Sequence, residues 1–273
     1  MIEIMEILLP FLGFLIGTVA SMVGVGGGVF IVPLLILIYD FSPSHAVGTS
    51  LATIVFTSLA STANYSRQKR IYYKAGLILA LTTVPGAFLG AYLTSIIEER
   101  LLGLIFGFFI FFVALRMIFK LSFSGTKHSD TEKSTYNTPV DSESSLFESK
   151  NRVLSGVVLG FFAGLSSGLL GIGGGSLMVP IMVLAMGIPM HITVATSMFT
   201  MIFTSTSGVI EHFRLDHINI EYALLLVLGT IFGAQLGAYA SKRVSGRNLC
   251  RIFGLVLIIV SIRIILKYGL NSF

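Results

Sequence analysis

Apolar residues in this chain form long uninterrupted runs, unlike the alternating or amphipathic patterns of a soluble protein. Residues 7–39 contain no Asp, Glu, Lys or Arg, and neither do the 58 residues from Val153 to Ile210. A helix rises about 1.5 Å per residue and the hydrocarbon core of a bilayer is about 30 Å thick. The second run must therefore cross or re-enter a bilayer more than once. The pattern predicts an all-α polytopic membrane protein.

Each half of the chain contains five apolar segments. In the first half they cover residues 5–23, 29–39, 45–66, 75–97 and 101–119. The second of these is too short to span a membrane as a helix. We therefore expect this segment and its partner in the second half, residues 176–187, to be half-length helices that either re-enter or continue a crossing after a break. Each half then has about four full spans plus one short helix.

The two halves are copies of one another. At a fixed offset and without a gap, residues 13–120 are identical to residues 160–267 at 38 of 108 positions. The stretch between the copies is rich in Ser and Thr, with mixed charge and few large apolar residues, which predicts a flexible polar linker. We expect a first membrane repeat over 1–120, this linker over 121–151, and a second membrane repeat over 152–273.

Loop charges indicate that the two repeats are inverted relative to one another. The loop at residues 66–74 carries four basic residues, whereas its equivalent at 213–221 carries one basic and two acidic residues. The next pair of loops reverses this pattern. Under the positive-inside rule both termini then lie outside a cell membrane and the linker is cytoplasmic. A parallel arrangement with four spans per copy distributes Lys and Arg almost as unevenly overall, so the local reversal is what favours inversion.

Composition agrees with this class and narrows the chemistry. Of the 273 residues, 54% are hydrophobic and 11% are charged, and the mean hydropathy is +0.90. Glu3 and Glu6 stand where a cleaved signal peptide would be basic, so we expect no such peptide. The single Cys250 excludes an intrachain disulfide and a cysteine-based metal site. We assign the net charge of +5 to cytoplasmic loops and expect no nucleic-acid binding.

Three successive glycines interrupt the apolar run at the same place in each copy. The first copy reads GVGGGVFIVP from residue 24, and the second reads GIGGGSLMVP from residue 171. Glycine is a poor helix former, and it lets the backbone turn sharply and approach a ligand closely. The helix that restarts after such a break exposes unpaired N–H groups and the positive end of its dipole. Two such ends facing each other would bind an anion without a buried Lys or Arg.

Inverted repeats with corresponding interrupted helices are typical of secondary transporters, whose site lies near the bilayer midplane. The alternative for the glycines is a helix crossing without a ligand, but packing needs spaced glycines and not three in a row. We expect the ligand-contacting glycines to be Gly24, Gly26, Gly27, Gly28, Gly171, Gly173, Gly174 and Gly175.

Hydroxyl residues form a stripe on the helix that follows each glycine break. Thr49, Ser50 and Thr53 fall within about one third of the helix circumference, and the second copy repeats them. Such a stripe either donates hydrogen bonds to an anion or bonds to its own or a neighbouring helix. Gln235, opposite Phe88 of the first copy, either lines the path or bridges helices. The expected substrate-binding residues of this kind are Thr49, Ser50, Thr53, Thr196, Ser197, Thr200 and Gln235.

Other motifs do not indicate an enzyme. The string GLSSG at 164–168 matches a nucleophile-elbow pattern, but it lies in a predicted membrane helix. No GxxxxGK[ST] motif exists, which argues against ATP-driven transport by this chain alone. We expect no enzymatic activity, no catalytic residue, no cofactor and no metal site. Glycine pairs with four-residue spacing elsewhere predict tight helix packing, at Gly13/Gly17, Gly86/Gly90, Gly103/Gly107, Gly160/Gly164 and Gly233/Gly237.

The paired glycine motifs are followed by VGTSL or VATSM and later by PGAFLGAYL and FGAQLGAYA. Together they resemble the sulfite exporter TauE/SafE family, also called the toluene sulfonate uptake permeases, over both copies. The resemblance implies a prokaryotic-type cytoplasmic-membrane permease for sulfite, sulfonates and other sulfur-containing or organic anions. The glycine clusters and the Thr-Ser pairs at 49 and 196 fall on recurrent motifs of that family. Its members differ in substrate and in direction.

The membrane potential favours export. With the inside negative, one charge crossing the membrane is worth about 2.3 kcal/mol per 100 mV, so an anion leaves without a coupled ion. We therefore predict export of a small anion by alternating access, in a lipid bilayer. One alternative is an ion-coupled importer, and another is a membrane assembly partner that transports nothing. Apolar outward-facing helices would accommodate a homo-oligomer, which no sequence feature specifies.

Overall fold

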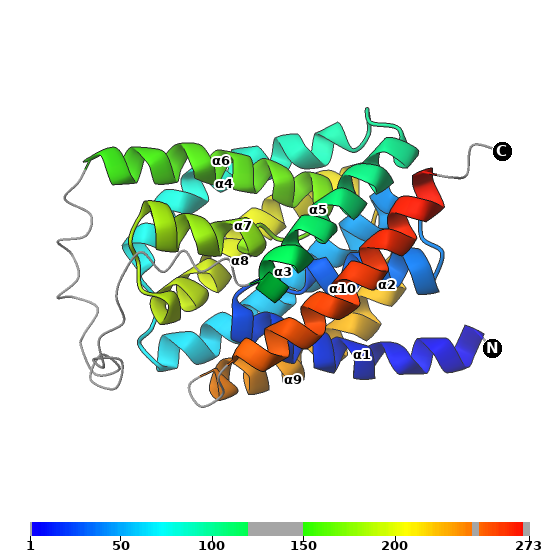
Figure 1. Cartoon of the computed structure of the whole chain (residues 1–273), viewed down its shortest axis with the longest axis horizontal. Helices are drawn as coiled ribbons and strands as arrows, with labels where there is room; N and C mark the ends of the chain where they lie inside the picture. Colours follow the sequence, from blue (N-terminus) through cyan, green and yellow to red (C-terminus); the bar gives the residue numbers. More distant parts are fainter. Residues whose placement is uncertain (1, 120–149, 242–245, 270–273) are drawn as a thin grey trace.

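The computed structural model describes residues 2–119, 150–241 and 246–269, which form helices joined by short turns (Figure 1). Most of the predicted linker lies outside these residues. The five segments expected in each half are present as helices, with ends shifted by a few residues. The helices are α1 (Ile2–Val23), α2 (Gly28–Ile38), α3 (Pro43–Arg67), α4 (Tyr73–Leu93), α5 (Glu99–Phe119), α6 (Lys150–Leu170), α7 (Gly175–Pro180), the π-helical turn η4 (Ile181–Ala185), α8 (Met190–Arg214), α9 (Ile220–Ala240) and α10 (Gly246–Gly269).

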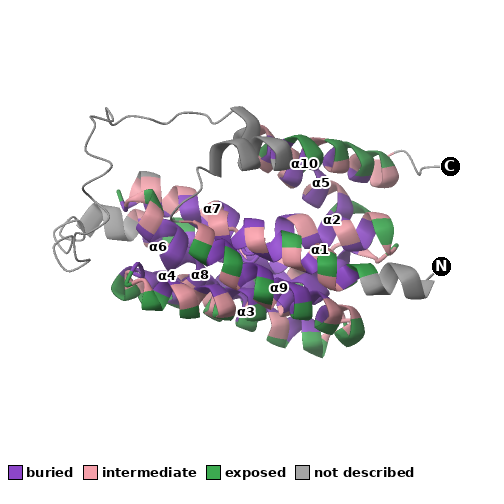
Figure 2. Ribbon diagram, turned by 90° about the horizontal axis from the view of Figure 1, so that it is seen from below, coloured by how far each residue is buried: buried purple, intermediate pink, exposed green. Residues whose placement is uncertain are grey.

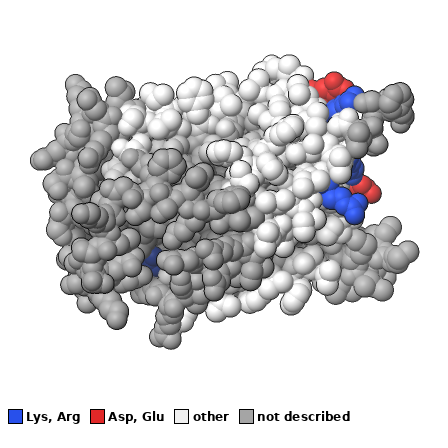
Figure 3. Space-filling model, in the orientation of Figure 1, with Lys and Arg blue, Asp and Glu red and all other residues white. Residues whose placement is uncertain are grey.

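Several helices meet the requirements of a membrane span. Among the described residues, α3, α4, α8 and α9 are long and apolar enough to cross a bilayer, and Leu8–Val23, Gly28–Ile38 and Ser155–Leu170 are shorter apolar helices. On the face drawn in Figure 3, the charged atoms of the described residues gather mainly at one end of the long axis, and the apolar middle shows few of them. The prediction of a polytopic helical membrane protein is confirmed.

The two long helices α3 and α8 pack against each other, and most of their residues are buried (Figure 2). Other helices form pairs that each join the two halves: α1 with α9, α6 with α4, and α5 with α10. The pair α6 and α4 is the counterpart of α1 and α9 when the halves are exchanged. The helices of each half are therefore packed mainly against helices of the other half.

Paired glycines let these helices touch backbone to backbone. A Cβ on Gly13 or on Gly17 of α1 would lie 2.6 Å from a carbonyl oxygen of α9. In the counterpart pair, a Cβ on Gly86 of α4 or on Gly164 of α6 would overlap a carbonyl oxygen of the partner helix. Only glycine fits such close crossings. The packing role predicted for the spaced glycines is confirmed at these positions.

The clustered glycines turn the chain back on itself. α1 runs past the centre of the bundle, and α2 returns toward the end from which α1 came (Figure 1). Asp40, just beyond α2, lies at that end because its carboxylate accepts a 2.6 Å hydrogen bond from Lys267 near the end of α10. In the second half, α6 enters from the opposite end and α7 with η4 returns toward it. Each short helix therefore turns back toward the end at which the preceding helix begins.

We call the end where α2 and α8 finish and α3 and α9 begin the histidine end, because it holds His45, His212 and His217. We call the opposite end, where α3 finishes and α4 and α8 begin, the arginine end, because it holds the buried Arg70.

Candidate functional site

Two glycine loops lie in the interior of the bundle, and we call residues 24–27 the first loop and 171–174 the second. Six of their glycines have positive φ, between +69° and +101°: Gly24, Gly26, Gly27, Gly171, Gly173 and Gly174. Side chains other than glycine adopt this left-handed region only with strain. The backbone path of each loop therefore requires glycine at the positions that the sequence repeats.

The two loops touch each other through their backbones. A Cβ on Gly28, at the start of α2, would overlap the carbonyl oxygen of Gly171. In the reciprocal contact, a Cβ on Gly175 would lie 2.5 Å from the carbonyl oxygen of Gly24. The structure thus brings together the two glycine clusters predicted from the sequence, although 147 residues separate them along the chain.

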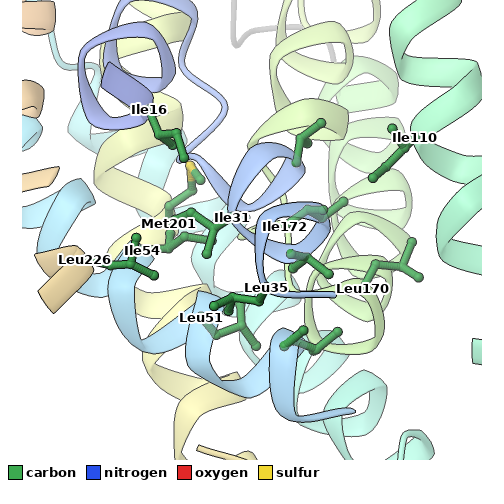
Figure 4. Close-up of a cluster of buried hydrophobic side chains, with 14 of the residues drawn as sticks. Ile16, Ile31, Leu35, Leu51, Ile54, Ile110, Leu170, Ile172, Met201 and Leu226 are labelled. Carbon is green, nitrogen blue, oxygen red and sulfur yellow. The ribbon is translucent and has the colours of Figure 1, made fainter. Parts of the chain in front are cut away.

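Two apolar side chains fill the space beside the loops. Ile54 on α3 and Met201 on α8 occupy equivalent positions in the two copies, and both are fully buried. A Cβ on Gly26 would overlap the Met201 methyl group, and a Cβ on Gly173 would lie 2.7 Å from that methyl and 2.9 Å from Ile54. Figure 4 shows both side chains within the buried apolar cluster. This conformation is closed around the loops.

Ser50 and Ser197 bind the loops reciprocally. The Ser50 hydroxyl donates to the carbonyl of Gly171 at 2.8 Å. The Ser197 hydroxyl shares its proton between the carbonyl of Gly24 at 3.0 Å and that of Val194, in its own helix, at 2.9 Å. Each loop is therefore held by a helix of the other half. These two hydroxyls are the members of the predicted stripe that contact the loops directly.

Thr49 and Thr196 make a second pair of reciprocal contacts. The Thr49 hydroxyl accepts a hydrogen bond from the N–H of Asn219 at 3.0 Å, and the Thr196 hydroxyl accepts one from the N–H of Tyr72 at 2.9 Å. Asn219 and Tyr72 are the N-caps of α9 and α4. These threonines thus fasten the start of the fourth helix of each half to the other half.

The remaining hydroxyls of the stripe bond mainly along their own helices. Thr53 donates to the carbonyl of Thr49 at 3.0 Å. Thr200 donates to the carbonyl of Thr196 at 3.0 Å and lies 3.3 Å from that of Gly76. All members of the stripe named here are fully buried. In this conformation the stripe bonds to protein, so an anion reaching it must replace or share these bonds.

Gln235 lies apart from the loops. Its side-chain amide donates to the carbonyl of Ala60 at 2.9 Å, and its Oε1 accepts a hydrogen bond from Asn64 at 3.2 Å. Both partners are on α3, near the arginine end. Of the two roles open from the sequence, the bridge between helices is the one seen in this conformation.

Ser167 is a candidate residue that the sequence reasoning missed. Its hydroxyl is buried without a hydrogen-bond partner, and it lies 3.7 Å from the place where a Cβ of Gly174 would stand. The matching residue of the first copy is Ala20, so only the second loop has this hydroxyl. The Ser-for-Ala difference between otherwise matching copies is the signal that could have found it.

Electrostatic pairs lie at the histidine end of the bundle. Lys267 also donates to the carbonyl of Ile36 at 3.0 Å, and its ammonium group holds the pKa of Asp40 below its usual value. Glu211 is buried near the end of α8 and pairs with Arg214 at 3.1 Å. Among the residues that the structure describes, no group of three or more His, Cys, Asp or Glu is arranged to hold a metal ion.

We expect Ser50→Ala and Ser197→Ala each to lower the free energy of unfolding by about 1–3 kcal/mol, because each leaves a buried loop carbonyl without its donor. Thermal unfolding of the purified protein in detergent measures the effect. Thr206→Ala is the matched control, since that hydroxyl is exposed and bonds to its own helix at the carbonyl of Ile202. Wild-type unfolding temperatures in both serine variants would contradict the assigned role.

Comparison with known proteins adds independent evidence. Residues 9–264 match the model of the family described as sulfite exporter TauE/SafE. The probable membrane transporter protein YunE of Bacillus subtilis is 35% identical over 266 residues, which cover 95% of this chain and 97% of YunE. A probable membrane transporter protein of Haemophilus influenzae is 28% identical over 274 residues, covering 93% of this chain and 96% of the relative.

A plant relative matches over a shorter stretch. Sulfite exporter TauE/SafE family protein 3 of Arabidopsis thaliana is 38% identical over 84 residues, covering 31% of this chain and 17% of the plant protein. No solved structure matches the chain.

Proposed function

Because the chain belongs to the sulfite exporter TauE/SafE family, a family of membrane transporters, we propose that it exports small anions: sulfite, sulfonates or related sulfur-containing or organic anions. The observation that carries the proposal is the contact between the two glycine loops, each held by a serine of the other half. In this proposal the loops are the substrate site, and the chain acts as a permease and not as an enzyme.

Backbone N–H groups supply the chemistry for an anion in this proposal. Phe30 and Ile31 donate to the carbonyl of Gly27, which leaves the N–H groups of Gly28 and Val29 without an acceptor inside α2. A helix start of this kind attracts negative charge. In the second loop, Leu177 and Met178 donate to the carbonyl of Gly174, and the hydroxyl of Ser167 lies nearby without a partner. The site would therefore bind an anion without a buried cation.

Alternating access between two inverted repeats is the proposed mechanism. Its support is the reciprocity of the contacts: those of α1 with α9, of Ser50 with Gly171 and of Thr49 with Asn219 each have a counterpart after the halves are exchanged. If the two repeats exchange conformations, the loops become accessible from the opposite end. The loop charges support placing the arginine end and the linker in the cytoplasm, with both termini outside a cell membrane.

Flux of radiolabelled sulfite in proteoliposomes tests the proposal, with an imposed potential of either sign and with sulfonates and small carboxylates as competitors. We expect sulfite flux that follows the potential. Flux that requires a Na⁺ or proton gradient would indicate the coupled importer instead. Absence of flux for every anion, from protein shown to be folded, would indicate a non-transporting assembly partner.

A double variant tests the site. We expect Gly27→Leu with Gly174→Leu to reduce sulfite flux at least about tenfold, because each side chain is forced into the left-handed region at about 1–2 kcal/mol and occupies space beside the loops. Gly187→Leu is the matched control: Gly187 also has positive φ but is exposed, between η4 and α8. Equal flux loss in the control would show that backbone strain alone, and not the loops, is responsible.

A further inference from the structure

Three histidines form a chain at the histidine end. His45 lies in the first turn of α3, His212 near the end of α8, and His217 in the turn before α9. The ring centroids of His45 and His217 are 5.5 Å apart, and those of His217 and His212 are also 5.5 Å apart. His45 is exposed, His217 is partly buried and His212 is fully buried. The chain leads from the surface into the bundle.

Hydrogen bonding assigns the protons on the two inner rings. His212 Nε2 lies 3.1 Å from the carbonyl oxygen of Gly168, and because a carbonyl only accepts, Nε2 carries a proton. The Nδ1 atom of the neutral ring is then an acceptor, and it faces His217 Nδ1 at 3.3 Å, which must donate. One further proton on either ring preserves this contact, because the other ring still accepts at its Nδ1 atom, whereas protonation of both rings sets two N–H groups against each other. This contact therefore requires that at least one of the two rings is neutral.

The hydrogen-bonded pair holds the histidine chain close to the second glycine loop. Gly168 belongs to the last turn of α6, directly before that loop. The end of α6 is in turn bonded to the second glycine loop, since the N–H of Gly171 donates to the carbonyl of Ser167 at 2.9 Å. Gly171 is the residue whose carbonyl Ser50 holds. His212 thus ties the end of α8 to the segment that positions the loop.

The arginine end contains the corresponding contact with different chemistry. Tyr65, the counterpart of His212, donates to the carbonyl of Ser21 at 2.7 Å, and the guanidinium of Arg70, the counterpart of His217, lies 5.2 Å from the Tyr65 ring centroid. Tyrosine and arginine keep their protonation state near neutral pH, whereas histidine does not. The contact therefore occurs at both ends of the bundle, and only the one at the histidine end consists of groups that change protonation near neutral pH.

We propose that His212 and His217 form a proton-binding site that regulates the anion passage, with the hydrogen-bonded pair holding the second glycine loop closed and protonation of both rings from the histidine end releasing it. The inference rests on the proposed transport function. Bound protons also offset the negative charge of the carboxylates at this end, Asp40, Glu99, Glu211 and Asp216, which favours the approach of an anion.

The direction of the effect follows from the surroundings of the pair. Burial, together with the neighbouring His45, lowers the pKa of His217, while Glu99 on α5 and Asp216 in the turn oppose this shift. The closed arrangement therefore disfavours the charged ring, and by linkage its stability is present above the usual histidine pKa and is lost as pH falls. Because the two rings are coupled, the titration belongs to the pair and not to one residue. Acid should open the passage.

Transport assays at equal pH on both sides test the regulation, using radiolabelled methanesulfonate as the probe because it stays ionised throughout. From about pH 7.5 to about pH 5.5 we expect wild-type flux to rise roughly tenfold, within the limit of tenfold per pH unit for one proton. His212→Gln keeps a donor for Gly168 but does not titrate, so its flux should stay low at every pH. His212→Phe lacks the donor, so its flux should stay high. His191→Gln, at the arginine end, is the control with a wild-type profile.

Imidazole nitrogen NMR of the substrate-free protein in detergent tests proton binding separately. At neutral pH we expect His212 as the neutral Nε2–H tautomer, titrating together with His217 as the pH falls. A wild-type pH profile in His212→Gln, or a His212 ring that carries its proton on Nδ1, would overturn the proposal. If wild-type protein moves no anion at any pH, the transport function fails, and the NMR result still decides whether the proton site exists.

Discussion

Replacing Gly229 with leucine should prevent the protein from folding. Gly229 lies on α9, where a Cβ would overlap the carbonyl oxygen of Pro10 on α1 and lie 2.7 Å from the N atom of Phe14. Those atoms are backbone and cannot rotate away. The helices must separate, which also breaks the close contacts of Gly233 and Gly237 with α1. We expect a loss of more than about 4 kcal/mol, against total stabilities of about 5–15 kcal/mol for folded proteins.

The yield of monodisperse protein after extraction from the membrane, followed by its unfolding temperature, measures this effect. Phe232→Leu is the matched control because it lies three residues away on the same helix, is 69% exposed and stays apolar. The control should behave as wild type. Monodisperse Gly229→Leu protein with a wild-type unfolding temperature would show that α1 and α9 do not pack as described.

Adding one methyl group at Gly28 should abolish transport. The Cβ of Gly28→Ala would overlap the carbonyl oxygen of Gly171 and lie 2.6 Å from the Cα of Ile172. The two loops must move apart, and the bond from Ser50 to Gly171 is then lost. We assign about 3 kcal/mol to this overpacking, which corresponds to a reduction in flux of roughly a hundredfold.

Potential-driven sulfite flux in proteoliposomes measures the loss, with size-exclusion chromatography to show that the variant is folded. Gly208→Ala is the matched control, because Gly208 is also a buried helical glycine and its nearest neighbour is the flexible end of Leu51 at 2.9 Å. We expect the control to retain most of its flux. Wild-type flux in Gly28→Ala would remove the loops from the transport path.

Much of the fold could be predicted because the apolar runs and the repeat are strong local signals. The length of residues 29–39 predicted a half-length helix, and the structure shows α2 there. Its partner was predicted as one short helix, but the structure divides it into α7 and the π-helical turn η4. Periodicity does not distinguish a π turn from an α turn over so few residues. The sequence also left open whether the short helices turn back or continue a crossing, since this depends on how α2 packs in three dimensions.

The site was predictable only in part. Glycine spacing identified both loops, because positive φ restricts those positions to glycine. The reciprocal bonds from Ser50 and Ser197 were not predictable, since they depend on which half supports which loop. The histidine chain was not predicted, because His45 and His212 do not occupy matching positions in the repeat. They come together only where α3 begins and α8 ends. The inverted arrangement and the ligand site stay predictions.

The pairing of α1 with α9 bears on how the chain is made. Residues 24–219 lie between the two helices, so the ribosome has produced most of the protein before α9 is available. Until then the glycine-lined face of α1 has only lipid or provisional neighbours. The first half is therefore an incompletely packed intermediate in the membrane until α9 is made. A chain that stops before α9 leaves α1 without its packing partner.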